Sequence, residues 1–106
     1  GVEGAQLDGL HLRLPGHGAD GPTLEIYQYT KLEENLPPLP NRVGLGHLAF
    51  LVDDVEAVLA LVVAGGGSAI GEISHADIRG KGHIEFVYAA DPEGNLIELQ
   101  DWSSGS

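Results

Sequence analysis

A degenerate internal repeat is the feature that most restricts how this 106-residue chain can fold. Residues 91–99 (DPEGNLIEL) and residues 20–26 (DGPTLEI) both place an acidic residue and a glycine ahead of an apolar-Glu-apolar triplet. The two glutamates, Glu25 and Glu98, lie 73 positions apart (98 minus 25). A repeat of this size predicts a fold built from two copies of one supersecondary unit.

The second copy of the repeat also contains a strand-like run with a histidine, residues 44–52 (GLGHLAFLV). The same offset puts the first-copy equivalent of His47 at position −26 (47 minus 73), before Gly1. We therefore expect a complete second unit and a first unit truncated at its N-terminus. A paired set of His and Glu would leave three members in this chain, Glu25, His47 and Glu98.

Changes in composition divide the chain into four predicted segments. The first segment, residues 1–30, holds two strands, over residues 5–14 and 23–30. The second segment, residues 31–43, carries three prolines, which exclude a helix and favour an extended linker. The third is the complete unit and the fourth (SSGS) a flexible tail. The segments are residues 1–30, 31–43, 44–102 and 103–106.

The second unit is predicted to run strand, helix, strand, strand, strand, which gives an α+β fold. Asp53 followed by Glu56 has the spacing of a capping box, and three glycines at 65–67 end the apolar helical pattern. The histidines His75 and His83 flank residues 76–82, which read as a loop able to cover a cleft. The expected strands are residues 44–52, 69–74, 83–89 and 96–101.

The charge of the chain excludes some classes of partner. Sixteen acidic and five basic residues give a formal net charge of −11, which argues against nucleic acid or an anionic membrane surface. No apolar run approaches the roughly 20 residues of a membrane span, and no signal peptide is visible. We therefore expect a cytoplasmic protein that binds a small molecule. Without cysteine, any metal site uses nitrogen and oxygen ligands.

Strand alternation brings the repeat-related residues toward one surface. His47 and Leu51 share a face of their strand, Glu98 lies on a face of the last strand, and Glu25 shares its face with Tyr27. A divalent ion would remove the cost of burying an unpaired carboxylate, and these ligands suit zinc, nickel, iron or manganese. The alternative is a hydrogen-bonded strand histidine with both glutamates on solvated faces.

Two segments of the chain resemble a known family. Residues 46–55 (GHLAFLVDDV) and 88–99 (YAADPEGNLIEL) are similar to the glyoxalase / bleomycin resistance / extradiol dioxygenase group, the vicinal-oxygen-chelate superfamily. The resemblance implies paired βαβββ modules whose first and last strands supply metal ligands. On that pattern His47 and Glu98 are ligands of module two, and Glu25 is the last-strand ligand of module one.

The ligand set implied by the resemblance is that of glyoxalase I. It implies a metal-dependent lyase or isomerase that moves a proton through an enediolate in a small substrate with vicinal oxygens, Glu98 being the first choice of base and Glu25 the second. Substrate contacts are expected at Tyr27, Leu51 and Tyr88. The alternatives are a metal-free, bleomycin resistance-like protein that sequesters a cationic ligand, and an Fe(II) ring-cleaving dioxygenase, in which Glu25 would have no role.

The expected truncation predicts self-association. A missing first strand would leave a sheet edge and apolar surface exposed, so we expect a homodimer or a higher homo-oligomer. Light scattering should then show a species larger than one chain, with a melting temperature that rises with protein concentration. A compact monomer whose melting is independent of concentration would contradict this prediction.

Overall fold

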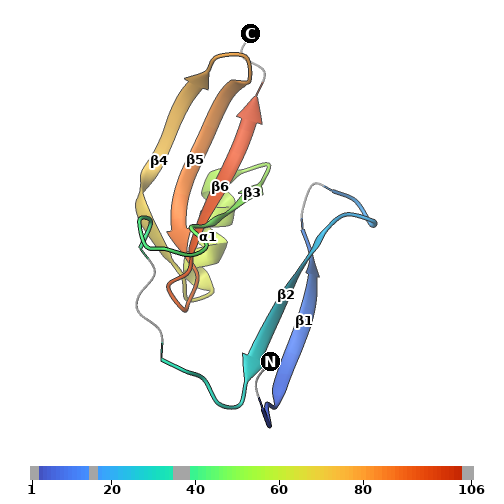
Figure 1. Cartoon of the computed structure of the whole chain (residues 1–106). Coiled ribbons are helices and arrows are strands. Elements are labelled where there is room, and N and C mark those ends of the chain that lie inside the picture. The colour runs from blue at the N-terminus through green and yellow to red at the C-terminus, as the bar shows by residue number, and fades with distance from the viewer. Residues whose placement is uncertain (1–2, 15–16, 35–38, 104–106) are drawn as a thin grey trace. The chain divides into compact units, whose positions relative to one another are not determined.

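The computed structural model describes residues 3–14, 17–34 and 39–103, and the chain divides into two compact units, Gly1–Leu36 and Pro37–Ser106. Each unit is described by itself below, with its elements labelled in Figure 1. Within the described residues, no helix is long and apolar enough to cross a membrane.

The first unit is a β-hairpin. Strands β1 (Leu7–Arg13) and β2 (Thr23–Tyr29) pair antiparallel, with Leu7 opposite Tyr29 and Arg13 opposite Thr23. Both strands were expected, and each is slightly shorter than predicted; Gly4, with φ of 67°, lies in the turn that precedes β1. A two-stranded hairpin can bury little apolar surface on its own.

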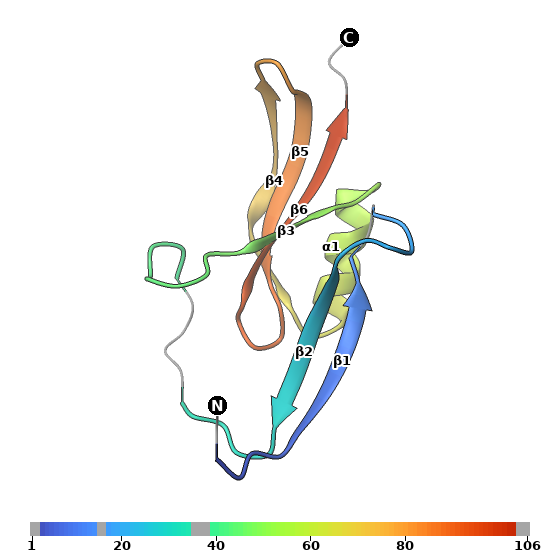
Figure 2. The same cartoon turned by 45° about the vertical axis from the view of Figure 1, so that its right-hand side comes forward.

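The second unit is a four-stranded sheet with one helix. The strands follow the order β3 (Leu48–Leu51), β6 (Leu96–Ser103), β5 (Gly82–Ala90), β4 (Ser68–Ile78) across the sheet. Strand β3 runs parallel to β6, whereas the other neighbours are antiparallel. Helix α1 (Val55–Ala64) packs against β4, β5 and β6, as Figures 1 and 2 show. The chain order is therefore strand, helix, strand, strand, strand, as expected.

The helix begins one residue later than predicted. The N-cap is Asp54 rather than Asp53, and its Oδ1 accepts a hydrogen bond of 3.0 Å from the Ala57 backbone N–H. Both aspartates are chemically suited to the position, and the extended backbone at Asp54 places its carboxylate over the first turn. At the other end the glycines stop the helix as expected, because Gly66 adopts a φ of 102°.

The predicted loop over residues 76–82 is wrong. Strand β4 continues to Ile78 and β5 begins at Gly82, so only a tight turn remains, closed by the Lys81 N–H donating to Ile78 O at 3.0 Å. Gly80 takes a φ of 81° in this turn. Alternation of Ile73, His75 and Asp77 with Ser74, Ala76 and Ile78 continues the strand where the sequence was interpreted as a break. This segment therefore forms a strand end and a tight turn instead of the expected lid.

The core lies between the sheet and α1. Val55, Val87 and Leu99 are fully buried, and seven partly buried apolar side chains pack around them: Phe50, Val52, Val58, Leu59, Val62, Ile73 and Ile97. Val87 and Leu99 are opposite one another on β5 and β6. Odd-numbered residues of β6 therefore face the helix as far as Leu99, and even-numbered residues face the other way.

Truncating Leu99 should destabilise the second unit strongly. The side chain is 2% exposed, so Leu99→Ala is expected to lower the free energy of unfolding by about 2–5 kcal/mol. Leu61→Ala is the matched control, because Leu61 is 71% exposed and its loss should change stability by no more than about 0.5 kcal/mol. Denaturant unfolding of both variants measures the difference. Equal losses of stability in the two variants would show that Leu99 does not lie in the core.

Candidate functional site

The turn between β5 and β6 fixes the position of the site. The Asp91 carboxylate accepts hydrogen bonds from the backbone N–H groups of Glu93 and Asn95 at 3.0 and 2.8 Å, and from Asn95 Nδ2 at 2.9 Å. Gly94 has a φ of 89°, which an L-residue with a side chain rarely adopts. This side-chain-closed turn sets the register in which Tyr88 lies opposite Glu98.

His47 and Glu98 form the centre of the candidate site. Ala49 of β3 pairs with Glu98 of β6, and His47 lies two residues earlier, so its side chain points to the same face. His47 Nε2 lies 3.1 Å from Glu98 Oε1. The predicted strand over residues 44–52 is shorter in the structure, and His47 precedes β3 rather than lying within it. The structure nevertheless brings the two predicted residues together.

A chain of hydrogen bonds along β6 holds the Glu98 carboxylate. Gln100 Nε2 donates to Glu98 Oε2 at 2.9 Å, and Trp102 Nε1 donates to Gln100 Oε1 at 2.9 Å. The indole can only donate, so it faces the oxygen of the Gln100 amide and leaves the amide NH₂ toward Glu98. Glu98 is only 7% exposed, yet both of its oxygens have partners. Its position is therefore defined from two sides.

Aromatic side chains border the carboxylate. The Tyr88 ring meets His47 edge-on, with centroids 5.2 Å apart and an interplanar angle of 87°, and Phe86 packs on Tyr88 at 6.2 Å. Leu51, more than half exposed, pairs with Gln100 across β3 and β6 and so shares this face. Two predicted substrate contacts, Leu51 and Tyr88, thus lie on the same side of the sheet as His47 and Glu98, opposite α1.

Glu25 and Tyr27 lie together in the first unit. The Tyr27 hydroxyl donates to Glu25 Oε2 at 3.1 Å, and His11 Nε2 lies 3.2 Å from Glu25 Oε1. His11 is directly opposite Glu25 in the hairpin. The Tyr27 ring covers Gly9, where an added Cβ would come within 2.3 Å of it. Glu25 belongs to a different unit from His47 and Glu98, so convergence of all three stays a prediction.

Several site residues were not singled out from the sequence. His11 was expected within the strand over residues 5–14 but was given no role, and in β1 its register opposite Glu25 places it beside that carboxylate. Strand alternation is the signal that could have found three more. Gln100 and Trp102 follow Glu98 at intervals of two residues, and Phe86 lies two residues before Tyr88. The amide orientation of Gln100 has no sequence signal, because it depends on a three-residue hydrogen-bond chain.

The His47 and Glu98 pair fits one side of a divalent metal site. Two donor atoms bound about 2.0–2.2 Å from the same ion lie roughly 2.8–3.6 Å apart for octahedral or tetrahedral angles, and the 3.1 Å between His47 Nε2 and Glu98 Oε1 falls in that range. A metal at this point would take the Nε2 lone pair and so replace the hydrogen bond between the two side chains. Among residues 3–14, 17–34 and 39–103, no three His, Asp or Glu side chains form a ready ligand set.

The second unit, with Glu98 and His47 on the open face of a βαβββ sheet, defines a domain of the vicinal-oxygen-chelate fold. A model of the Glyoxalase/Bleomycin resistance protein/Dioxygenase superfamily matches residues 5–99, and the chain belongs to that superfamily. This confirms the predicted family and the α+β fold class.

A solved structure shows the same fold in a relative. The crystal structure of a glyoxalase family protein from Bacillus cereus superposes with a TM-score of 0.61 at 18% sequence identity, over 76% of this chain and 53% of that one. The chain thus spans about half the length of that protein. No curated protein sequence matches the chain. At this identity the likeness concerns the fold.

The contact between Tyr27 and Glu25 predicts a measurable titration. The hydrogen bond to the Glu25 carboxylate raises the pKa of the Tyr27 hydroxyl above its usual value, and the negative charge of Glu25 adds to the effect by disfavouring the phenolate. Tyr27 should therefore keep its proton to higher pH than a free tyrosine, and Glu25→Gln should lower its midpoint toward about 10.

Near-ultraviolet absorbance during alkaline titration measures this midpoint, and Tyr27→Phe assigns the signal among the three tyrosines. Removing the carboxylate without changing the midpoint would show that Glu25 and Tyr27 are not in contact in solution.

Proposed function

We propose that the protein is a metal-dependent lyase or isomerase of the glyoxalase I type, which transfers a proton next to a carbonyl in a small substrate with vicinal oxygens. The observation that carries the proposal is the His47 and Glu98 pair, in which a nearly buried carboxylate lies 3.1 Å from an imidazole on the open face of the sheet. Superfamily membership supports a function of the glyoxalase, bleomycin resistance or dioxygenase type.

His47 Nε2 and Glu98 Oε1 would hold a divalent ion, with nickel, zinc, iron and manganese all compatible with these ligands. Glu25 would complete the protein ligands if its hairpin approaches the second unit. When bound, such an ion supplies Lewis-acid polarisation of the substrate oxygens and lowers the barrier to removing a neighbouring C–H proton. Two or more copies of the chain would form the active assembly.

Glu98 is the first candidate for the base. Its surroundings exclude most solvent, and the Gln100 amide holds Oε2 in a fixed direction, so the carboxylate needs little reorganisation to accept a proton. Glu25 is the second candidate; it is exposed in its own unit and hydrogen-bonded to Tyr27. Leu51 and Tyr88 would contact the substrate from the second unit and Tyr27 from the first.

A metal-free binding protein is the second candidate function. Both oxygens of Glu98 already have partners within the chain, so its burial does not require a metal. An acidic group bordered by Tyr88, Phe86 and Trp102 is also the kind of surface that binds an organic cation. A ring-cleaving Fe(II) dioxygenase would use His47 and Glu98 but would leave Glu25 without a role.

Metal analysis of the chain tests the first proposal. The protein should bind a divalent transition metal at His47, and His47→Ala should lower the bound metal by one ion per chain, whereas His17→Ala, at an exposed position in the loop between β1 and β2, should leave the amount of bound metal unchanged. Hemithioacetal isomerisation should then depend on added nickel or zinc. Glu98→Gln, which keeps the shape of the side chain, should lower kcat/KM by about 10²–10⁴-fold.

The outcomes separate the candidate functions. Metal bound at His47 without isomerase activity would shift the proposal to an epimerase or to the dioxygenase. Binding of a cationic ligand that depends on Glu98, with no metal bound at His47, would establish the sequestering protein instead.

A further inference from the structure

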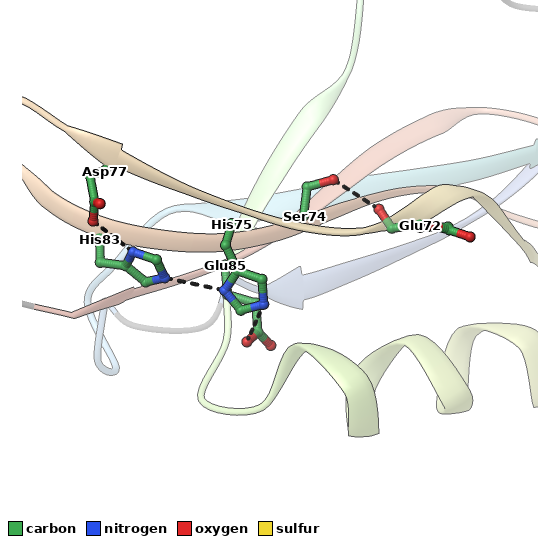
Figure 3. A network of polar contacts seen from close by, with 6 residues as sticks. All are labelled: Glu72, Ser74, His75, Asp77, His83 and Glu85. Carbon is green, nitrogen blue, oxygen red and sulfur yellow. Dashed lines mark hydrogen bonds and ion pairs between the residues drawn. The ribbon is translucent and has the colours of Figure 1, made fainter.

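A second cluster of titratable side chains lies on the β4–β5 hairpin, away from the candidate site. Figure 3 shows its core: His75 and Asp77 from β4, and His83 and Glu85 from β5. His75 is opposite Glu85, and Asp77 is opposite His83. Along β5 these residues share the face of Val87, whereas Phe86 and Tyr88 face the other way. The cluster is therefore on the opposite side of the sheet from His47 and Glu98.

The four side chains form one continuous line. Asp77 Oδ1 lies 2.8 Å from His83 Nδ1, His83 Nε2 lies 3.2 Å from His75 Nδ1, and His75 Nε2 lies 3.5 Å from Glu85 Oε2. The two imidazole rings are close to parallel, at 27°, with centroids 5.3 Å apart. Each histidine thus uses one ring nitrogen toward a carboxylate and turns the other toward its neighbour.

Two neutral imidazoles carry two ring hydrogens, one fewer than the three contacts in this line of side chains. A carboxylate only accepts, so His83 Nδ1 and His75 Nε2 carry the ring hydrogens in the pattern that satisfies both acids. In neutral imidazoles the two remaining nitrogens, His83 Nε2 and His75 Nδ1, then face each other as bare lone pairs. That contact is repulsive unless a proton or a metal ion lies between the nitrogens, or unless His75 takes the other tautomer, donates from Nδ1 to His83 Nε2 and gives up its 3.5 Å contact with Glu85.

We propose that His75 and His83 bind a divalent transition-metal ion between these two nitrogens. Two imidazole nitrogens about 2.0–2.1 Å from a tetrahedral zinc ion lie roughly 3.4 Å apart, close to the 3.2 Å between His83 Nε2 and His75 Nδ1. Metal-bound histidines usually donate their other N–H to a carboxylate, which fixes the tautomer and raises ligand basicity. Asp77 and Glu85 are placed to accept these hydrogens.

The chemistry of the site indicates which ions it takes. Imidazole suits zinc, copper(II) and nickel, and the two neighbouring carboxylates offset the charge of the ion. Two protein ligands leave coordination positions for water or an external ligand, and His75 and His83 are both accessible, at 54% and 36% side-chain exposure. A bound ion would also join edge strand β4 to β5 between the β-bulge of residues 70–74 and the hairpin turn.

Zinc titration by calorimetry in the His47→Ala background isolates this site from the other candidate site. The His47→Ala chain should still bind one zinc ion, and His47→Ala combined with His83→Gln should lose that binding step. His47→Ala combined with His17→Gln is the matched control and should bind as the parent does. Asp77→Asn in the same background should weaken binding by about 10–100-fold, because the ligand remains and only its hydrogen-bond acceptor is altered.

Nuclear magnetic resonance of the unsubstituted chain provides a test that does not depend on the variants folding. Stoichiometric zinc should shift the imidazole signals of both His75 and His83. Zinc affinity unchanged by His83→Gln, or zinc that leaves both of these imidazole signals in place, would overturn the proposal. The calorimetric titrations use chains that carry His47→Ala and therefore lack the His47 site. A negative result in these titrations would overturn the zinc site of His75 and His83 without bearing on the proposed enzyme function.

Discussion

The strict alternation of side chains along β6 ties the core of the second unit to its candidate site. Leu99 points to α1 and packs with Val55 and Val87, while Glu98 and Gln100, one residue to either side, point to the open face. A shift of one residue would exchange these two sets and place the carboxylate in the core. The Asp91 turn prevents that shift by closing on three hydrogen bonds. Core packing and site geometry therefore depend on one register.

The elements of the second unit could be predicted from the sequence because each has a local signal. The helix has its apolar period and terminal glycines, and the last strand has a side-chain-closed turn before it. The pairing of His47 with Glu98 was predicted from the repeat together with strand alternation, which fixes the face that each side chain takes. The family match over residues 5–99 agrees with those same segments.

Other features could not be predicted because they depend on contacts between strands. The residues around Gly80 look like a loop in the sequence, yet pairing with β5 extends β4 to Ile78 and brings His75 beside His83. Likewise, two adjacent aspartates are equally suited to cap α1, and only the backbone decides for Asp54. The convergence of Glu25 with His47 and Glu98 stays a prediction, because Glu25 belongs to a different unit.

The bond between Trp102 and Gln100 gives the candidate site a built-in optical probe. Trp102 is the sole tryptophan in the sequence, so the intrinsic indole fluorescence of the chain comes from one place. Its N–H is two hydrogen bonds away from the Glu98 carboxylate. Any molecule that draws Glu98 away from Gln100 frees the amide to turn, and this changes the polarity around the indole. Occupancy of the open face can therefore be followed by emission spectroscopy without attaching a label.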